Sequence, residues 1–168
     1  MSNVSSLHFV QQQGFRGADN QNCDSQYSSL MFQPRLIGSV VLLGLIFQAW
    51  PLFLALSAIL WWNVIVPPRN PFDAQYNKFV SGKNGLPRLQ PALAPRRFAQ
   101  GMAATFMVGI GISLLLGWHV AAWVLEGFLI IALTALIFGK FCLGSYVYYL
   151  LRGESGFANR TLPWARAS

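Results

Sequence analysis

The fold is decided by residues 98–151, which read FAQGMAATFMVGIGISLLLGWHVAAWVLEGFLIIALTALIFGKFCLGSYVYYLL. Only two of these side chains carry a full charge, and a Gly117-Trp118 turn divides the stretch. A helix needs about 20 apolar residues to cross a hydrocarbon core of about 30 Å. The stretch therefore predicts two membrane-spanning helices, over residues 98–116 and 119–138.

The composition of the whole chain also indicates a membrane protein. Of its 168 residues, 54% are hydrophobic and 10% are charged, whereas soluble domains carry about 25% charged residues. The net charge of +7 would also suit a nucleic-acid-binding protein, but no recognition motif accompanies it. Basic residues beside apolar helices instead indicate contact with anionic lipid headgroups. We therefore expect the lipid bilayer as a partner, and no nucleic acid.

A second apolar stretch, residues 36–66, contains no charged side chain. At 1.5 Å per residue it would form a helix of about 46 Å, which is too long for one span. Trp50-Pro51 lies near its middle, and proline is favoured in the first turn of a helix. We predict two short spans, 36–49 and 51–66; the alternative is one tilted span followed by an interfacial segment.

Three polar segments flank the apolar stretches. Residues 1–33 are rich in glutamine, asparagine and serine and predict a disordered cytosolic tail, because they bury little apolar surface. Residues 67–97 hold six Lys or Arg and one Asp, a net charge of +5, and predict a basic cytosolic loop with a short amphipathic helix over 72–80. Residues 153–168 predict a second cytosolic tail, which leaves 34–152 as the membrane domain.

The distribution of basic residues predicts the topology. All twelve Lys and Arg lie outside the two tryptophan-containing turns, in or beside the polar segments. Basic residues favour the cytoplasmic side of a membrane. We therefore expect an all-α integral membrane protein of four transmembrane helices, arranged as two helical hairpins, with both termini in the cytoplasm. No signal-peptide pattern is present, so the first span is expected to direct insertion.

Small residues recur at every fourth position of the third span. In lipid, this spacing lets helix backbones approach closely. We expect the row to pack against the fourth helix, although another subunit is the alternative partner. The row consists of Gly101, Thr105, Gly109, Ser113 and Gly117.

Glu126 lies seven residues inside the fourth span, about 10 Å from its start. A carboxylate at that depth is costly unless it is paired or protonated, so it is a candidate functional residue. His119 lies two turns earlier on the same face. The two side chains predict either a path for protons or ions, or a structural hydrogen bond from Glu126 that ties the two hairpins together.

Cys142 is the third candidate functional residue. Lys140 lies close to it in sequence, and a neighbouring cation could favour a reactive thiolate. The alternative is a packed apolar side chain, which is common for free cysteine. Cys23 should remain reduced in a cytosolic tail. The chain shows no metal-ligand spacing, so neither a metal nor a cofactor is expected.

Three arginines precede the first and third spans. Arg35, Arg96 and Arg97 are expected to be interfacial anchors that set the topology. The alternative interpretation is a shared basic site for a lipid phosphate or for an anionic surface of a partner.

Two stretches, Pro-Arg-Arg-Phe-Ala-Gln over 95–100 and Phe-Cys-Leu-Gly-Ser-Tyr-Val-Tyr over 141–148, resemble the bacterial membrane family called domain of unknown function 4395. The resemblance covers about residues 30–152. It implies a four-span protein of the bacterial inner membrane and no established activity. The family pattern implies Cys-x-x-Cys in the last helix. Here the second position is Ser145, so that local disulfide cannot form.

Together these features predict a non-enzymatic protein. It has a row of helix-packing residues and few side chains of the types that carry out catalysis. These features favour a scaffold or accessory subunit that packs against a larger, possibly bioenergetic, membrane complex, or against a second copy of itself. The alternatives are a thiol-redox component that uses Cys142 and a small oligomeric transporter that uses Glu126.

Overall fold

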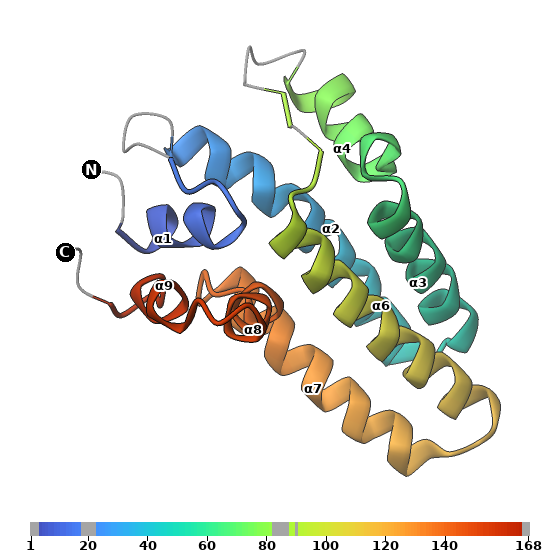
Figure 1. Cartoon of the computed structure of the whole chain (residues 1–168). Helices are drawn as coiled ribbons and strands as arrows, with labels where there is room; N and C mark the ends of the chain where they lie inside the picture. The colour runs from blue at the N-terminus through green and yellow to red at the C-terminus, as the bar shows by residue number, and fades with distance from the viewer. Residues whose placement is uncertain (1–3, 18–22, 82–87, 90, 166–168) are drawn as a thin grey trace.

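The computed structural model describes residues 4–17, 23–81, 88, 89 and 91–165, and within these ranges the chain is helical and contains no strand (Figure 1). The predicted all-α fold is thereby confirmed for the described residues. Three segments are long and apolar enough to cross a membrane, and a fourth apolar helix is shorter. The four helices that contain them are α2 (Cys23–Phe47), α3 (Trp50–Ile65), α6 (Ala94–Leu115) and α7 (His119–Ile137).

Two short turns lie at the same end of these helices, which we call the turn end (Figure 1). Residues 48 and 49 join α2 to α3, and residues 116–118 join α6 to α7. Pro51 lies in the first turn of α3 as predicted, where its missing N–H costs nothing. Gly117 adopts a φ of +73°, a left-handed conformation that favours glycine.

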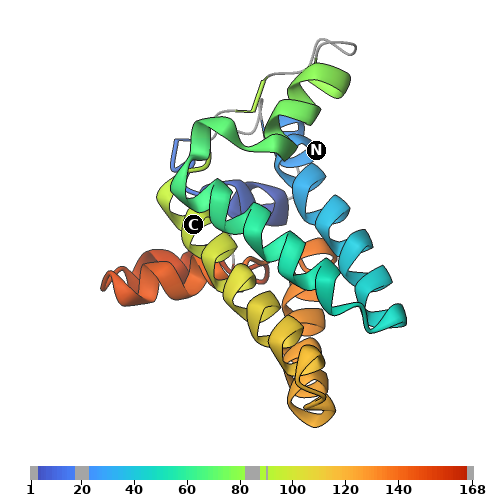
Figure 2. The same cartoon turned by 90° about the vertical axis from the view of Figure 1, so that its right-hand side faces the viewer.

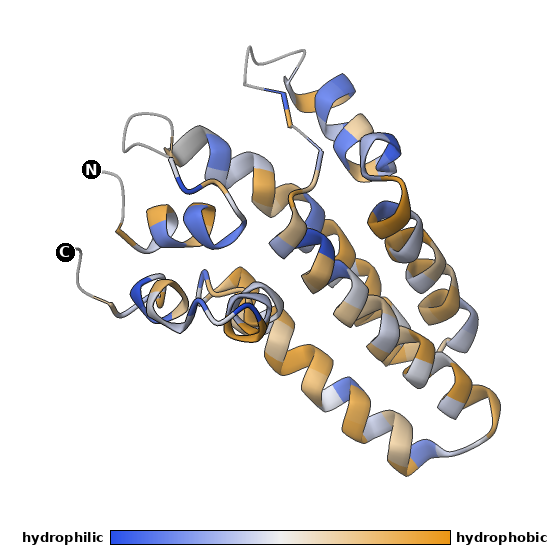
Figure 3. Cartoon of the chain, in the orientation of Figure 1, coloured by the Kyte–Doolittle hydropathy of each residue, from blue (hydrophilic) through white to orange (hydrophobic). Residues whose placement is uncertain are grey.

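The shorter helices lie toward the opposite end of the molecule, which we call the polar end (Figure 1). Hydrophilic residues are frequent there, whereas α7 is mostly hydrophobic along its length (Figure 3). The predicted helix over 72–80 is present as α4 and the π-helical turn that follows it. The short elements are α1 (Val4–Gln12), η1 (Pro67–Arg69), α4 (Pro71–Tyr76), η2 (Asn77–Ser81), α8 (Leu143–Leu151) and α9 (Ser155–Arg160).

The predicted starts of the long helices agree within a few residues, except for α2. This helix begins at Cys23 instead of residue 36 and continues through Pro34. Proline removes one backbone hydrogen bond from a helix interior. Apolar packing of Leu30 and Met31, which are both buried, accompanies this extension.

The N-terminal segment also differs from the predicted disordered tail. Its described part forms α1 and the first turns of α2, while residues 1–3 and 18–22 lie outside the described ranges. Phe9 and Val10 of α1 are buried together with Leu30, Met31 and Cys142. The average composition of the tail is polar, but its apolar residues Phe9 and Val10 contact residues that are distant in the sequence.

The core lies between α3 and α6, with α2 and α7 beside them. Figure 2 shows α3 in front of α6 and α2. The Ser57 hydroxyl donates to the carbonyl of Ala104, 3.0 Å away, and so joins α3 to α6. A Cβ at Gly111 would lie 2.7 Å from the side chain of Leu54, so the two helices approach closely at this glycine.

At the polar end, the segment that follows α1 contacts the C-terminal helices. Arg16 forms an ion pair with Glu154 and lies over the rings of Tyr149 and Phe157. The hydrogen bond with Glu154 raises the pKa of Arg16. Burial raises the pKa of the Tyr149 phenol, and the nearby guanidinium partly opposes this shift. The N- and C-terminal segments are thus packed together.

Candidate functional site

A buried ion pair lies near the start of α6. The guanidinium of Arg96 donates to Asp73 of α4 at 3.0 Å and to the side-chain oxygen of Gln33 on α2 at 2.6 Å. All three residues are buried. Because a buried charge is stable only when it is paired, this contact fixes α4 against α2 and α6.

Asn70 places Asp73 in this cluster. Its side-chain oxygen accepts a hydrogen bond from the backbone N–H of Phe72, 3.0 Å away, and so caps α4. Its side-chain nitrogen donates to Asp73 at 3.0 Å and to Gln33 at 3.4 Å. The local sequence Asn-Pro-Phe-Asp therefore builds a helix start that directs a carboxylate inward.

Gln100 completes the polar cluster, one turn after Arg96. Its nitrogen donates to the side-chain oxygen of Gln33, 3.1 Å away. Its own oxygen, Oε1, is buried and has no hydrogen-bond partner among the described residues. An unpaired buried acceptor is costly, so this atom marks a place where a further donor would be stabilising.

A chamber of about 90 Å³ adjoins the cluster. Gln33, Arg96 and Gln100 form its polar wall, together with Gln13. Most of the remaining wall is apolar and comes from α1, α2, α3, α6 and α7; it includes Phe9, Leu30, Ile37, Leu60, Met107 and Leu133. The chamber therefore suits a molecule with one polar end and one apolar end.

Cys142 also lines the chamber and is buried. It is the residue before α8, and its backbone N–H donates to the side chain of Gln12, 2.8 Å away. The Ser145 hydroxyl donates to its sulfur at 3.3 Å. Lys140, expected to act on this thiol, instead donates to Ser6 at 2.8 Å.

A surface groove of about 200 Å³ lies between α6, α7 and the start of α8. Ala103, Leu133 and Cys142 line both the groove and the chamber. Phe128 and Ile131 are exposed at the groove. The chamber and the groove thus lie on either side of the same side chains.

The structure brings Glu126 and Gln48 together near the turn end. Glu126 is only 5% exposed, and the Gln48 side chain donates to both of its carboxylate oxygens at 3.3 Å. Gln48 reaches this position from a left-handed backbone conformation, with φ of 47°, between α2 and α3. His119 is exposed, and its ring lies 6.3 Å from that of Trp123. Glu126 thus contacts the α2–α3 turn. This is the contact expected if Glu126 forms a structural hydrogen bond that ties the two hairpins together.

The three predicted arginines have three different environments. Arg96 is buried in the polar cluster, which differs from the expected interfacial anchor. Arg97 donates two hydrogen bonds to the carbonyl of Val64, at 2.6 and 3.0 Å, and so ties α6 to the end of α3. Arg35 is exposed on α2. Among the described side chains, Arg35, Arg96 and Arg97 therefore do not form the single shared basic site that was the alternative interpretation.

The predicted row of small residues does not face one neighbour. A Cβ at Gly101 would lie 3.8 Å from Val64 of α3, and one at Gly109 would lie 3.0 Å from Leu125 of α7. Ser113 is buried, and Thr105 is exposed and donates to the carbonyl of Gly101. The row contributes to both interfaces of α6.

Sequence reasoning missed the partners of Arg96, because Gln33 and Asp73 were assigned to a disordered tail and a loop. One signal was present: Asp73 is the sole carboxylate in residues 67–97. Gln100 was a second signal, since an amide near the start of an apolar span needs a partner. No group of three or more metal-ligating side chains occurs among the described residues.

Comparison with known proteins identifies a family that covers most of the chain. A family model described as Domain of unknown function (DUF4395) matches residues 29–152, in agreement with the predicted coverage. This range contains the polar cluster, most of the chamber wall, Glu126 and Cys142. No curated protein and no solved structure matches the chain.

Proposed function

The chain belongs to the DUF4395 family of unknown function, and from this premise we propose that it is a four-span inner-membrane protein that serves as an accessory subunit. Its apolar helices are compatible with a membrane protein. In this proposal α3 is the fourth span, although its 16 residues reach only about 24 Å. A locally thinned bilayer would accommodate a helix of that length.

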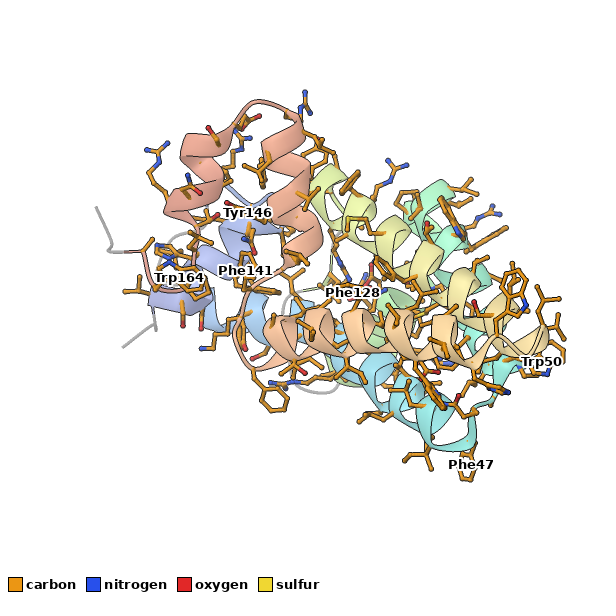
Figure 4. All side chains as sticks on the ribbon, turned by 90° about the horizontal axis from the view of Figure 1, so that it is seen from below. Phe47, Trp50, Phe128, Phe141, Tyr146 and Trp164 are labelled. Carbon is orange, nitrogen blue, oxygen red and sulfur yellow. The ribbon has the colours of Figure 1, made fainter. Side chains whose placement is uncertain are left out.

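The positions of the aromatic and polar residues support this topology. Phe47 and Trp50 lie at the turn end, and Phe141, Tyr146 and Trp164 lie at the other (Figure 4). Aromatic residues are favoured at both membrane interfaces. The described parts of both terminal segments pack at the polar end, which in this proposal faces the cytoplasm.

A groove between α2 and α7 carries the proposed accessory role. It measures about 270 Å³ and is lined by apolar residues, by Gly38, Ser39 and Thr134, which are small or carry a hydroxyl group, and at one end by the charged Arg35. Ser39 and Thr134 are exposed. Small residues and hydroxyl groups are what transmembrane helices use to approach one another closely. We assign this groove to a transmembrane helix of a partner protein.

The test is co-purification from native membranes in mild detergent. The full chain should retain a partner at fixed stoichiometry, and Ser39→Trp should lose it because the indole fills the groove. Ala58→Trp is the matched control, since Ala58 is exposed on α3, away from the groove. A lone monomer under every gentle condition, or a partner that survives Ser39→Trp, would contradict the proposal.

The two alternative functions have weaker support. A thiol-redox component needs access to Cys142, which is buried between α1, α6 and α7. A transporter needs several ionisable groups along a path, whereas the hydrogen bonds of the Glu126 carboxylate to the described residues come from the neutral amide of Gln48. Both residues have structural contacts that account for their burial.

A further inference from the structure

A groove of about 400 Å³ lies between α3 and α6, and we call it the α3–α6 groove. Trp61 and Val64 form its α3 wall. One charged side chain, Arg97 in the first turn of α6, lines the groove at the end nearest the start of α6. The α6 wall consists of Ala94, Arg97, Phe98, Gly101, Met102 and Thr105.

The Arg97 guanidinium has a donor that the protein leaves unused. Its Nε and Nη2 atoms both donate to the carbonyl of Val64, at 3.0 and 2.6 Å. Nη1 has no hydrogen-bond partner among the described residues, and it is not one of the buried unpaired atoms of the described side chains. The side chain as a whole is half-buried. Nη1 is therefore accessible to an acceptor from outside the protein.

Arg97 also has no counter-ion among the described side chains. Residues 67–97 carry a net charge of +5, so the sequence around it is basic as well. A negatively charged acceptor therefore complements this end of the groove, because a hydrogen bond between charged groups is stronger than one between neutral groups. Each carboxylate among the described side chains has another partner: Asp73 contacts Arg96, Glu126 contacts Gln48, and Glu154 contacts Arg16.

Beyond Arg97 the wall of the groove is mostly apolar. It continues along α6 to Thr105, eight residues further, which is about 12 Å at 1.5 Å per residue. A Cβ at Gly101, halfway along, would come within 4 Å of one described atom, Cγ2 of Val64 at 3.8 Å. The glycine thus leaves space against the helix backbone. This part of the groove suits a hydrocarbon chain.

The order of these features matches the depth of a lipid in the membrane. In the proposed topology the start of α6 lies at the cytoplasmic interface, so Arg97 lies at the level of the headgroups and Thr105 lies deeper. Trp61 is exposed on the α3 wall, one turn before α3 ends at Ile65. Tryptophan is favoured at the interface. The charged end of the groove is thus near the headgroups, and its apolar end is among the acyl chains.

We propose that the α3–α6 groove binds an anionic glycerophospholipid of the cytoplasmic leaflet. The lipid phosphate accepts a hydrogen bond from Nη1 of Arg97, and one acyl chain lies along α6 over Gly101. This site rests on the proposed membrane topology. It does not rest on the accessory role, because the groove assigned to a partner helix lies between α2 and α7.

The test measures lipid binding by native mass spectrometry of the purified full chain in mild detergent. With dioleoyl phosphatidylglycerol and dioleoyl phosphatidylcholine as competitors, one phosphatidylglycerol should bind about fivefold more tightly, because its headgroup is anionic. Arg97→Gln should remove this preference. Arg69→Gln is the matched control and should retain it, because Arg69 is exposed and does not line the groove.

Two further comparisons test where the acyl chain lies. Gly101→Leu should weaken binding of both lipids, because its side chain would fill the groove. Gly127→Leu on α7 is the matched control, since a Cβ there meets no described atom within 4 Å. Glycerophosphoglycerol, which is the headgroup without acyl chains, should not displace the bound lipid.

The preference between the two lipids is a ratio within one protein, so reduced stability of Arg97→Gln does not affect it. The measurement uses neither a bilayer nor a partner protein, so it can fail while the proposed function holds, and the reverse. Four results would each overturn the lipid site: equal binding of the two lipids, a preference that survives Arg97→Gln, displacement by glycerophosphoglycerol, or unchanged binding in Gly101→Leu.

Discussion

Arg96 shows how one side chain links sequence to packing. Its position before an apolar helix is typical of an interfacial anchor. Its guanidinium is instead buried and contacts Asp73 and Gln33, so it connects α6 to α4 and α2. One guanidinium nitrogen, Nη2, donates to both partners.

Removing the charge of Asp73 should therefore destabilise the fold. In Asp73→Asn, Arg96 would remain buried without its counter-ion, and the free energy of unfolding should fall by about 3–5 kcal/mol. Unfolding in mixed detergent micelles measures this change. Arg96→Gln in the same chain should restore part of the loss. Arg69→Gln, at an exposed position, is the control, and a loss as large as that of Asp73→Asn would contradict the explanation.

At the scale of the elements, the start of α8 is held against α6. A Cβ on Gly144 would lie 2.6 Å from both Cα and Cβ of Ala99, so the two backbones approach at this glycine. The ring of Tyr148 lies 5.8 Å from that of Phe98 and continues the contact along α8. This contact positions Cys142, which immediately precedes α8, at the wall of the chamber.

Gly144→Ala should displace α8 from α6. The added methyl group meets a backbone that cannot rotate away, and overpacking of this kind costs about 1–3 kcal/mol. We expect lower stability and faster alkylation of Cys142 by N-ethylmaleimide, measured by mass spectrometry of the peptide. Gly156→Ala in α9 is the matched control, because a Cβ there meets no atom within 4 Å. An unchanged rate in Gly144→Ala would show that α8 does not shield the thiol.

At the scale of the whole molecule, the two ends differ in construction. The turn end consists of short connections with exposed aromatic residues, Phe47, Trp50 and Trp118. The polar end contains α1, α4, α8 and α9; Arg16 joins the segment after α1 to the C-terminal helices, and the Arg96 cluster joins α4 to α2 and α6. This asymmetry is compatible with the proposed topology, in which the polar end faces the cytoplasm and the turn end lies near the opposite membrane surface.

The proposed topology predicts opposite labelling of two introduced cysteines. Leu116→Cys, at the turn end, should react with a membrane-impermeant maleimide in spheroplasts. Arg152→Cys, beyond α8, should react only in inverted vesicles. Both positions are exposed, and the wild-type chain is the control because Cys23 and Cys142 are buried. Labelling of both positions from the same side would contradict the single span, α7, that the proposed topology places between them.

The positions of most long helices could be predicted from the sequence, because hydrophobic runs and prolines determine the conformation of the residues beside them. Trp50-Pro51 and Gly117-Trp118 marked both turns within a residue or two. The α2 start could not be predicted, since residues 23–33 are polar on average and become helical through contacts with distant segments. Glu126 was recognised as needing a partner, but its pairing with Gln48 depends on a left-handed turn.

By itself, the sequence determined the helical class and the apolar segments, because composition and hydrophobic runs are properties of neighbouring residues. The family was recognised separately, from its resemblance over 95–100 and 141–148. The tertiary structure alone decided which polar groups meet. Gln33, Asp73, Arg96 and Gln100 lie on three different elements, and only helix packing brings them together. The chamber beside them is likewise a property of packing, since no single helix contains its polar and apolar walls.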